Sequence, residues 1–232
     1  MKFTHKVFHL EESVERQQYV NNINAYLKPH SVELDTKTIK ISNQEEFIEN
    51  ILENKDFVLD FNGYNLDSIQ GWRYGEIGLW LSNFLAWKKF LDSDADCGIF
   101  MEDDIVFKEN FIDLLKQYLL EIPNNWDAFF FAVPEGQFHK YNVHGIDIGL
   151  KNICRVYQDH WMLCYILSKN GASKAINSAK SGVSLPVDWH FFRQKHLFNS
   201  YSIKPTSEFG CFGSPTETTF QTQPRKIMTI DS

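Results

Sequence analysis

Apolar and polar positions alternate along the chain in blocks that predict an α/β domain. Short apolar runs bounded by polar residues are typical of buried strands, and they occur at residues 6–10, 57–60, 97–101, 126–133 and 162–167. Apolar residues at helical spacing follow the first run, where Val14, Val20, Ile23 and Leu27 are expected to face inward, and also follow the third. Small residues after the fifth run suit a strand-to-helix turn. A strand, turn and helix at the start of the chain would place the first turn at the ligand-binding edge of a parallel sheet.

One helix is expected to be buried. The segment 75–91 is apolar nearly all round, with few charges before Lys88 and Lys89, and such a helix belongs in a protein interior. We expect this helix to pack across the sheet and to lead directly into the strand at 97–101. From residue 204 the sequence shows no regular apolar pattern and is rich in Pro, Thr and Ser. We therefore expect 204–232 to be a tail that wraps the domain.

The strand at 97–101 runs directly into Glu102, Asp103 and Asp104. Carboxylates at the end of a buried strand point into the crevice where open α/β sheets bind ligands. Three adjacent carboxylates repel one another unless a cation or a solvated turn relieves them. The stretch therefore predicts a divalent-metal site that holds a phosphorylated substrate, and an ordinary acidic turn is the alternative.

Composition favours one domain and excludes some partners. A chain of 232 residues with 43% hydrophobic and 23% charged residues fits one globular domain better than two. Its net charge is −7 and it has no basic run, so we expect no nucleic-acid partner. A nucleotide ligand is still compatible with this net charge, because one bound metal ion makes the electrostatic potential at an acidic site positive.

Location and redox state follow from two further patterns. The first residues hold too few apolar positions for a signal peptide, and no apolar run approaches the roughly 18 residues of a membrane span. We expect a cytoplasmic protein, with peripheral membrane contact through an acceptor left open. The four cysteines show no CxxC pair or zinc spacing, which predicts reduced, buried thiols.

Several polar residues outside the acidic triplet are candidates for chemistry. Arg16 lies at the first strand-to-helix turn, where a phosphate could bind, and a surface charge is its alternative. Asp188 follows Pro186 and precedes His190. The polar segment 134–151 is predicted to be a long loop, and its His139, Tyr141 and His144 are expected to be surface residues.

The order of these pieces resembles glycosyltransferase family 25, which includes bacterial lipooligosaccharide and collagen galactosyltransferases. The similar segments span roughly residues 5–192 and read LEESVER, GEIGLWLSNFLAW, MEDD, WMLCYILSKNGA and PVD. GEIG followed by MEDD about two dozen residues later is the specific part. The chain departs from the family pattern at three positions, where Asn62, Leu79 and Asn83 replace an acid, a cysteine and a histidine.

The resemblance implies a GT-A type fold, with residues 1–232 forming a single Rossmann-type domain that has a mostly parallel central sheet flanked by helices. It also implies metal-dependent, inverting transfer of a hexose, galactose or similar, to a hydroxyl of a glycan or glycoconjugate acceptor. The donor would be a nucleotide sugar, UDP-linked, and the cofactor Mn²⁺ or Mg²⁺. Because of Asn62 and Asn83, the alternative is a catalytically inactive nucleotide- or sugar-binding module. A metal-dependent phosphoesterase is weaker, since it usually needs more His and Asp ligands.

The implied mechanism gives the acids roles. A hard divalent cation prefers oxygen ligands, and we expect Glu102 and Asp104 to hold it, with Asp104 in direct contact. Asp103 would contact a ribose or sugar hydroxyl. Asp188 is the candidate base for the acceptor hydroxyl, and its alternative is the N-cap of a helix that begins at Trp189. His190 is either a further metal ligand or a residue that orients the loop.

Three other residues complete the expected site. Arg16 and Glu76 are expected to contact the nucleotide and the sugar. Trp72 or Trp189 could stack on a sugar face, and a place in the core is the alternative for both.

Overall fold

The computed structural model describes residues 1–60, 65–66, 69–70, 72–134, 145–156, 162–194, 196–204 and 206–213. Asn62 and the three residues of the predicted long loop, His139, Tyr141 and His144, lie outside the described residues. Within the described part of the chain, no helix is both long and apolar enough to cross a membrane.

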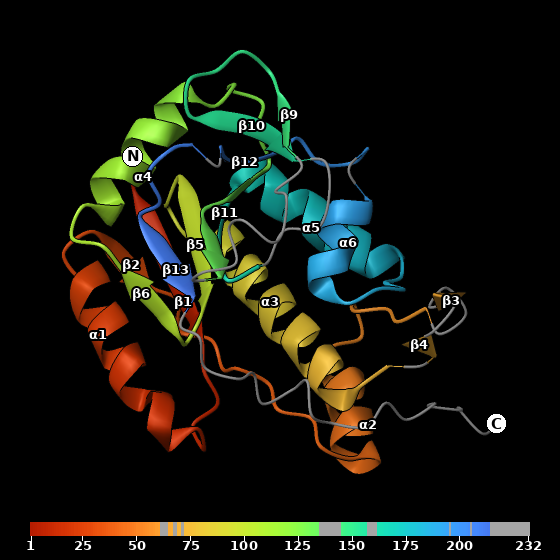
Figure 1. Cartoon of the computed structure of the whole chain (residues 1–232). Coiled ribbons are helices and arrows are strands. Elements are labelled where there is room, and N and C mark those ends of the chain that lie inside the picture. Colours follow the sequence, from red (N-terminus) through yellow and green to blue (C-terminus); the bar gives the residue numbers. More distant parts are fainter. Residues whose placement is uncertain are drawn as a thin grey trace.

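The centre of the protein is an eight-stranded sheet in the order β2-β1-β5-β11-β7-β12-β10-β9 (Figure 1). In that order, the strands are Ser31–Glu33, Phe3–Phe8, Cys97–Glu102, Cys164–Ser168, Ala128–Phe130, Ser200–Ile203, Ile153–Val156 and Gly145–Asp147. β2, β1 and β5 run parallel to one another, as do β7 and β12, whereas β11 is antiparallel to both β5 and β7. The predicted α/β domain is confirmed, with a mixed sheet at its centre.

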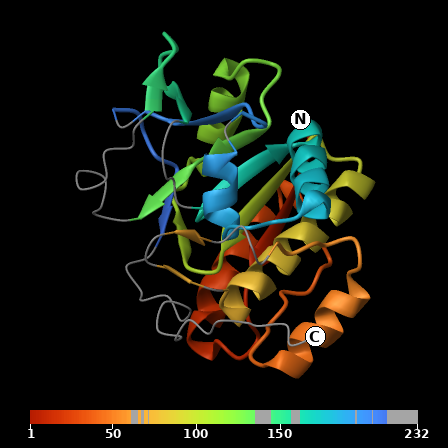
Figure 2. The same ribbon diagram turned by 90° about the vertical axis from the view of Figure 1, so that its right-hand side faces the viewer.

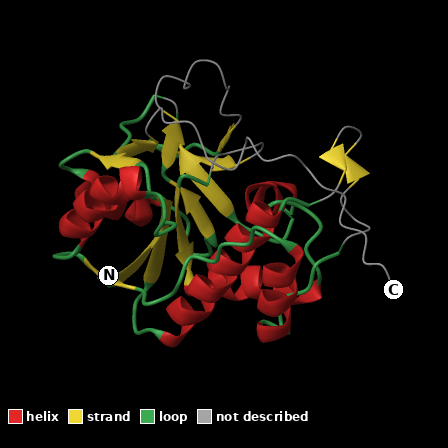
Figure 3. Ribbon diagram, turned by 90° about the horizontal axis from the view of Figure 1, so that it is seen from below, coloured by secondary structure: helices red, strands yellow, loops and turns green. Residues whose placement is uncertain are grey.

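Helices cover both faces of this sheet (Figure 3). α3 (Tyr74–Asp92), α5 (Lys169–Ser181) and α6 (Val187–Arg193) pack on one face, together with strand residues such as Phe100 and Tyr165. α1 (Gln17–Leu27) and α4 (Phe111–Glu121) pack on the other, against residues such as Ile99 and Ile166. Side chains of one strand point alternately to the two faces, and this alternation gives the three layers two separate cores.

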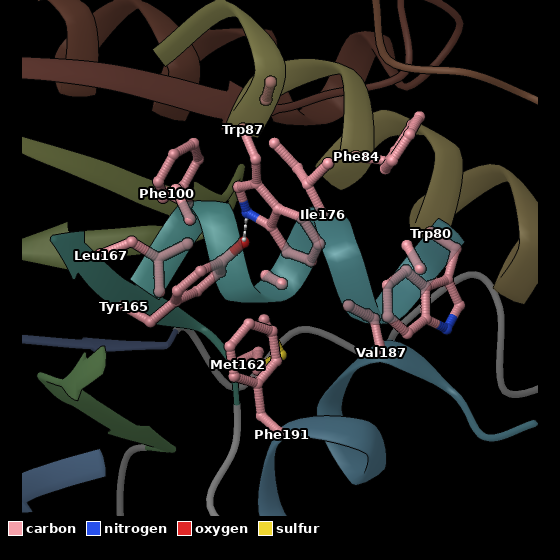
Figure 4. Packing of buried hydrophobic residues seen from close by; sticks show 14 of the residues in the cluster. Trp80, Phe84, Trp87, Phe100, Met162, Tyr165, Leu167, Ile176, Val187 and Phe191 are labelled. Carbon is pink, nitrogen blue, oxygen red and sulfur yellow. Dashed lines mark hydrogen bonds between the residues drawn. The ribbon is translucent and has the colours of Figure 1, made fainter. Parts of the chain in front are cut away.

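α3 is the buried helix that the sequence predicts. Most of its side chains are enclosed, including Trp80, Phe84 and Trp87, each 0% exposed. It runs side by side with α5, as the view in Figure 2 also shows. The indole of Trp87 donates a hydrogen bond of 3.0 Å to the hydroxyl of Tyr165 on β11 (Figure 4). The helix is therefore fixed to the sheet by a polar contact as well as by apolar packing.

Smaller elements complete the fold. A three-stranded sheet joins β6 (Ile105–Phe107), β13 (Cys211–Gly213) and β8 (Ala132–Pro134). A second pairing joins β3 (Asn65–Leu66) and β4 (Ile69–Gln70). The short 3₁₀ helix η1 (Val14–Arg16) precedes α1. The N-cap of α2 (Gln44–Glu53) is Asn43, whose side chain accepts a hydrogen bond from the backbone N–H of Glu46. All four cysteines are free and buried, as predicted.

Three local predictions differ from the structure. Residues 57–60 form only an isolated bridge between Leu59 and Val183, because they lie beside the end of α5 and the residues that follow it. Val14, expected to face inward, is 74% exposed, because it lies in η1 and not yet in α1. Part of the predicted irregular tail forms β13, which pairs with β6 and β8.

Candidate active site

The candidate site forms where two neighbouring parallel strands end. β1 and β5 pair so that Phe8 lies opposite Glu102. The residues that follow, His9 after β1 and Asp103 after β5, therefore leave the sheet at the same edge. The carboxyl ends of parallel strands are where open α/β sheets bind ligands, so the position of the acidic triplet agrees with the prediction from the sequence.

Asp103 is enclosed by protein groups. Its side chain is 8% exposed, and Nη1 of Arg16 donates a hydrogen bond of 2.7 Å to its Oδ1. The imidazole Nδ1 of His9 lies 2.8 Å from its Oδ2. Both oxygens thus have protein partners, which makes Asp103 an internal counter-ion. The predicted contact of Asp103 with a ribose or sugar hydroxyl stays a prediction, since each oxygen can accept a further hydrogen bond.

Arg16 is a part of the site, and its reading as a surface charge is wrong. Its side chain is 12% exposed, and Nη1 also lies 3.8 Å from Oδ2 of Asp104. Burial alone would lower the pKa of Arg16, but the hydrogen bond and charge of Asp103, with the charges of Asp104 and Glu102, raise it. The guanidinium therefore supplies a fixed positive charge next to the triplet.

Glu102 and Asp104 hold the rest of the negative charge. Asp104 is 2% exposed and Glu102 is half-buried. Burial, together with the charges of Asp104, Asp103 and Asp188, raises the pKa of Glu102 to about 8 against the opposing charge of Arg16. Because Asp188 contributes to this shift, the fold brings the two acidic segments predicted from the sequence within electrostatic reach of each other.

Asp188 lies in the first turn of α6, which begins at Val187 and has Pro186 at its N-cap. The predicted N-cap role is therefore wrong, because the helix starts two residues before Trp189. The carboxylate Oδ1 accepts a 2.9 Å hydrogen bond from the backbone N–H of Trp189. A carboxylate in the first turn is stabilised by the helix dipole, and Asp188 is only half-buried, so the base role stays a prediction that this position allows.

His190 contacts α5 and α3. Its Nε2 lies 2.7 Å from Oγ of Ser178 on α5, and its ring meets the edge of Trp80 on α3 at 5.0 Å between centroids. The residue is 1% exposed, and burial lowers its pKa to about 4. The structure does not bring His190 to Glu102 or Asp104, so its role as a metal ligand stays a prediction without geometric support.

Two further predicted ligand contacts have structural roles. Oε2 of Glu76 accepts a 2.9 Å hydrogen bond from the backbone N–H of Arg73, which caps the start of α3. Trp72 is 1% exposed and belongs to the core under α3, so its alternative reading as a core residue is confirmed. Trp189, next to Asp188, is half-buried and stays a candidate for stacking on a sugar.

The site fits a divalent cation only if a substrate completes the coordination. Among the described residues, no three His, Cys, Asp or Glu side chains form a ready-made metal cluster. Mg²⁺ is usually held by one or two carboxylates together with substrate phosphates, whereas all-protein cages are unusual for it. Glu102 and Asp104 are oxygen donors of that kind, and their crowding with Asp103 is the repulsion that a cation would relieve.

His9 is the functional-site residue that the sequence did not indicate. The predicted first strand extended to Leu10, which placed His9 inside the strand rather than at its end. The observed strand stops at Phe8, and the pairing with β5 brings His9 beside Asp103. Only the register of two strands separated by almost ninety residues reveals this contact.

Known proteins resemble this chain in sequence. The model of the family described as "Glycosyltransferase family 25 (LPS biosynthesis protein)" matches residues 7–191. The chain is 26% identical over 158 residues to procollagen galactosyltransferase 2 of Mus musculus, covering 63% of this chain and 24% of that protein. It is 27% identical over 117 residues to the probable inactive glycosyltransferase 25 family member 3 of Bos taurus, covering 49% and 19%. The chain thus spans about a quarter or less of the length of these relatives.

Solved structures resemble it more distantly. A mutant of Drosophila β-1,4-galactosyltransferase 7 in complex with manganese, UDP-Gal and xylobiose is 13% identical with a TM-score of 0.43, covering 90% of this chain and 67% of that one. A TarS fragment of S. aureus in complex with UDP-GlcNAc is 11% identical with a TM-score of 0.45, covering 97% and 62%. The family pattern matches most of the chain and includes both acidic segments of the candidate site, which shows that this chain belongs to glycosyltransferase family 25.

Proposed function

We propose that this chain is a metal-dependent glycosyltransferase that moves a hexose from a UDP-linked nucleotide sugar to a hydroxyl of a glycan or glycoconjugate, with inversion. The observation that carries the proposal is the gathering of Asp103, Asp104 and Arg16 where the parallel strands β1 and β5 end. Family membership supports a transferase of the GT-A type, and the names of the procollagen galactosyltransferases support galactose as the hexose.

Glu102 and Asp104 would hold a divalent cation together with the diphosphate of the donor. When bound, that cation acts as a Lewis acid and neutralises the charge that grows on the nucleoside diphosphate as it leaves. Arg16 adds a fixed positive charge to the same edge of the sheet. The elements of this chain therefore place positive charge beside the carboxylates without a basic patch anywhere else in the sequence.

Asp188 would take the proton from the acceptor hydroxyl. Inversion needs a base on the side of the sugar opposite the leaving group. Asp188 lies on α6, whereas Glu102 is the last residue of β5 and Asp104 follows it by two residues. Carboxylates from two separate elements can take opposite sides of a sugar, and this separation supports a base role for Asp188.

The direct test is nucleotide release from a panel of UDP- and GDP-sugars with Mn²⁺ or Mg²⁺. We expect release from a UDP-sugar that a chelator abolishes. Asp188→Asn should lower the rate by about 10²–10⁴-fold, the usual contribution of a general base, and Asp104→Asn should weaken nucleotide binding in the presence of metal. Asp113→Asn, which alters an exposed acid on α4, is the matched control. Silence across the panel, with Asp104→Asn binding nucleotides like the wild type, would contradict the proposal.

An inactive binding module is the second candidate, and the relatives named inactive favour it. The position of Asn83 argues against it. Asn83 is 2% exposed, donates a hydrogen bond to the backbone oxygen of Leu79 and accepts one from the hydroxyl of Tyr165. This departure from the family pattern therefore changes the core beneath the sheet and not the acidic site. Calorimetry that finds metal-dependent nucleotide binding, with no turnover on any acceptor, would favour the inactive module.

A further inference from the structure

His9 has no part in the mechanism described so far, although it contacts the acidic triplet directly. Its side chain is 10% exposed, and that of Asp103 is 8% exposed. Nδ1 of His9 lies 2.8 Å from Oδ2 of Asp103. An ionised carboxylate only accepts hydrogen bonds, so the proton of this contact is on Nδ1. His9 is therefore a donor that is buried with the carboxylate it binds.

The imidazole is held from its backbone as well. The backbone N–H of His9 donates a hydrogen bond of 3.1 Å to Oγ1 of Thr38. On the other side, the pairing of Phe8 with Glu102 fixes the ends of β1 and β5 relative to each other. The backbone that carries the ring is thus held at two points that do not involve the side chain of Asp103.

Asp103 lies between the two carboxylates that matter for the cation. The turn from β5 to β6 contains Glu102, Asp103 and Asp104 in succession, and the charges of the three repel one another. Two charge-assisted bonds, one from Arg16 and one from His9, leave the middle carboxylate a single orientation. Because the three residues are consecutive, restraining the middle one also restricts the backbone of the turn from which Glu102 and Asp104 project.

We propose that His9 is a positioning residue, whose Nδ1–H holds Asp103 so that Glu102 and Asp104 are presented together to the divalent cation and the diphosphate of the donor. The inference rests on the proposed function for the identity of the ligands. It adds a residue outside the acidic segments and assigns Asp103 to the support of the site. Mutation of a group that hydrogen-bonds to metal ligands and orients them commonly lowers metal affinity or activity by about 10–100-fold.

Three substitutions at one position test which atom of the ring matters. His9→Asn keeps an N–H donor close to the place of Nδ1, whereas the amide of His9→Gln reaches toward the place of Nε2. His9→Ala removes both. His196→Ala, at an exposed histidine, is the control. The measurements are calorimetric titration of UDP into the protein with saturating Mn²⁺, and the unfolding of each variant in urea.

We expect His9→Ala and His9→Gln to weaken UDP binding in Mn²⁺ by about tenfold or more, and His9→Asn to stay within about threefold of the wild type. In a double-mutant cycle with Asp103→Asn, the second substitution should add little to the first, because His9 acts through Asp103. UDP binding without metal should change less than binding with metal in the alanine variant.

Two outcomes would overturn the inference. One is a His9→Ala protein that unfolds more easily but binds UDP and Mn²⁺ like the wild type, since the contact would then stabilise the fold alone. The other is an equal loss in the asparagine and alanine variants. Turnover is not the readout, so a wild-type protein that binds UDP with Mn²⁺ but transfers no sugar would contradict the proposed function and not the role of His9.

Discussion

Three adjacent carboxylates at the end of β5 have three different surroundings. Asp103 is bound on both oxygens by Arg16 and His9. Asp104 is buried beside the same guanidinium, and Glu102 is half-buried with its pKa raised to about 8. Neighbours in sequence therefore differ in their bonding partners and in their exposure, because each meets a different set of groups. At the scale of the residue, contacts rather than residue type decide which carboxylate can take a ligand.

A buried histidine gives a prediction about pH. Burial lowers the folded-state pKa of His190 to about 4, below the ordinary value of 6.5, so below pH 6.5 the unfolded chain binds the extra proton. Its share of the stability is complete above pH 6.5 and is lost as the pH falls toward 4. Between pH 7 and pH 4.5, the free energy of unfolding should fall by about 2–3 kcal/mol more in the wild type than in His190→Gln.

The comparison cancels the other groups that titrate in this range, because they are common to both proteins. Gln can keep a hydrogen bond to Ser178 without a titrating ring. Urea unfolding at four or five pH values measures the difference. Parallel pH profiles of the two proteins would show that His190 is accessible to protons in the folded state and would contradict the burial observed.

At the scale of the element, contacts of α3 connect the GEIG motif to the acidic site, although the two are far apart in sequence. A Cβ on Gly78 would stand 2.6 Å from the backbone oxygen of Ile39. Oγ of Ser82 donates to the backbone oxygen of Gly78 and accepts from the N–H of Ile39. Within the GEIG segment and the turn after it, small residues thus let the chain at 38–41 lie directly on the helix. Thr38 in that chain supports His9, which links the motif to the acidic site.

Gly78→Ala should destabilise the protein although it favours a helix. Alanine gains up to about 1 kcal/mol in helix propensity over glycine, but the new methyl group meets backbone that cannot rotate away. We expect a net loss of about 1–3 kcal/mol in the free energy of unfolding, measured in urea. Lys89→Ala, on the exposed part of the same helix, should change it by less than about 0.5 kcal/mol. A stabilised Gly78→Ala protein would mean that the chain at 38–41 can move off the helix.

At the scale of the whole molecule, contacts between distant segments hold the strands β7 and β12 to the helix α5. Asp127 precedes β7 and is 0% exposed. Its carboxylate accepts hydrogen bonds from Asn170 and Lys174 on α5 and from the backbone N–H of Asn199 before β12. One buried carboxylate therefore ties two neighbouring strands to the helix that covers them.

Removing this carboxylate should weaken the fold without changing the acidic site. Asp127→Ala leaves the N–H of Asn199 and the ammonium of Lys174 without their partner, at a cost of about 3 kcal/mol. Urea unfolding measures this loss, with Asp113→Ala as the control. At temperatures where the variant is folded, its affinity for UDP in Mn²⁺ should match that of the wild type. Loss of binding by the folded variant would show that β7 and α5 are coupled to the site.

The sequence by itself determined the local chemistry of the protein. Its short apolar runs predicted β5, β7 and β11, its long apolar segment predicted α3, and its helical spacing predicted α4. The acidic triplet was expected at a strand end, where it lies. These predictions succeed because burial and periodicity act over a few residues, and because the family motifs preserve the order of the pieces even at low identity.

Only the tertiary structure decided which of these residues meet. The antiparallel insertion of β11 between β5 and β7 follows from pairing between distant segments, which no periodicity encodes. The same holds for His9 beside Asp103, 94 residues apart, and for Asp188 near Glu102. Trp72 and His190 carry functional groups that suit a site, yet the layers enclose them in the core. Sequence fixes the chemistry a side chain offers, whereas strand register and helix packing fix the partner it finds.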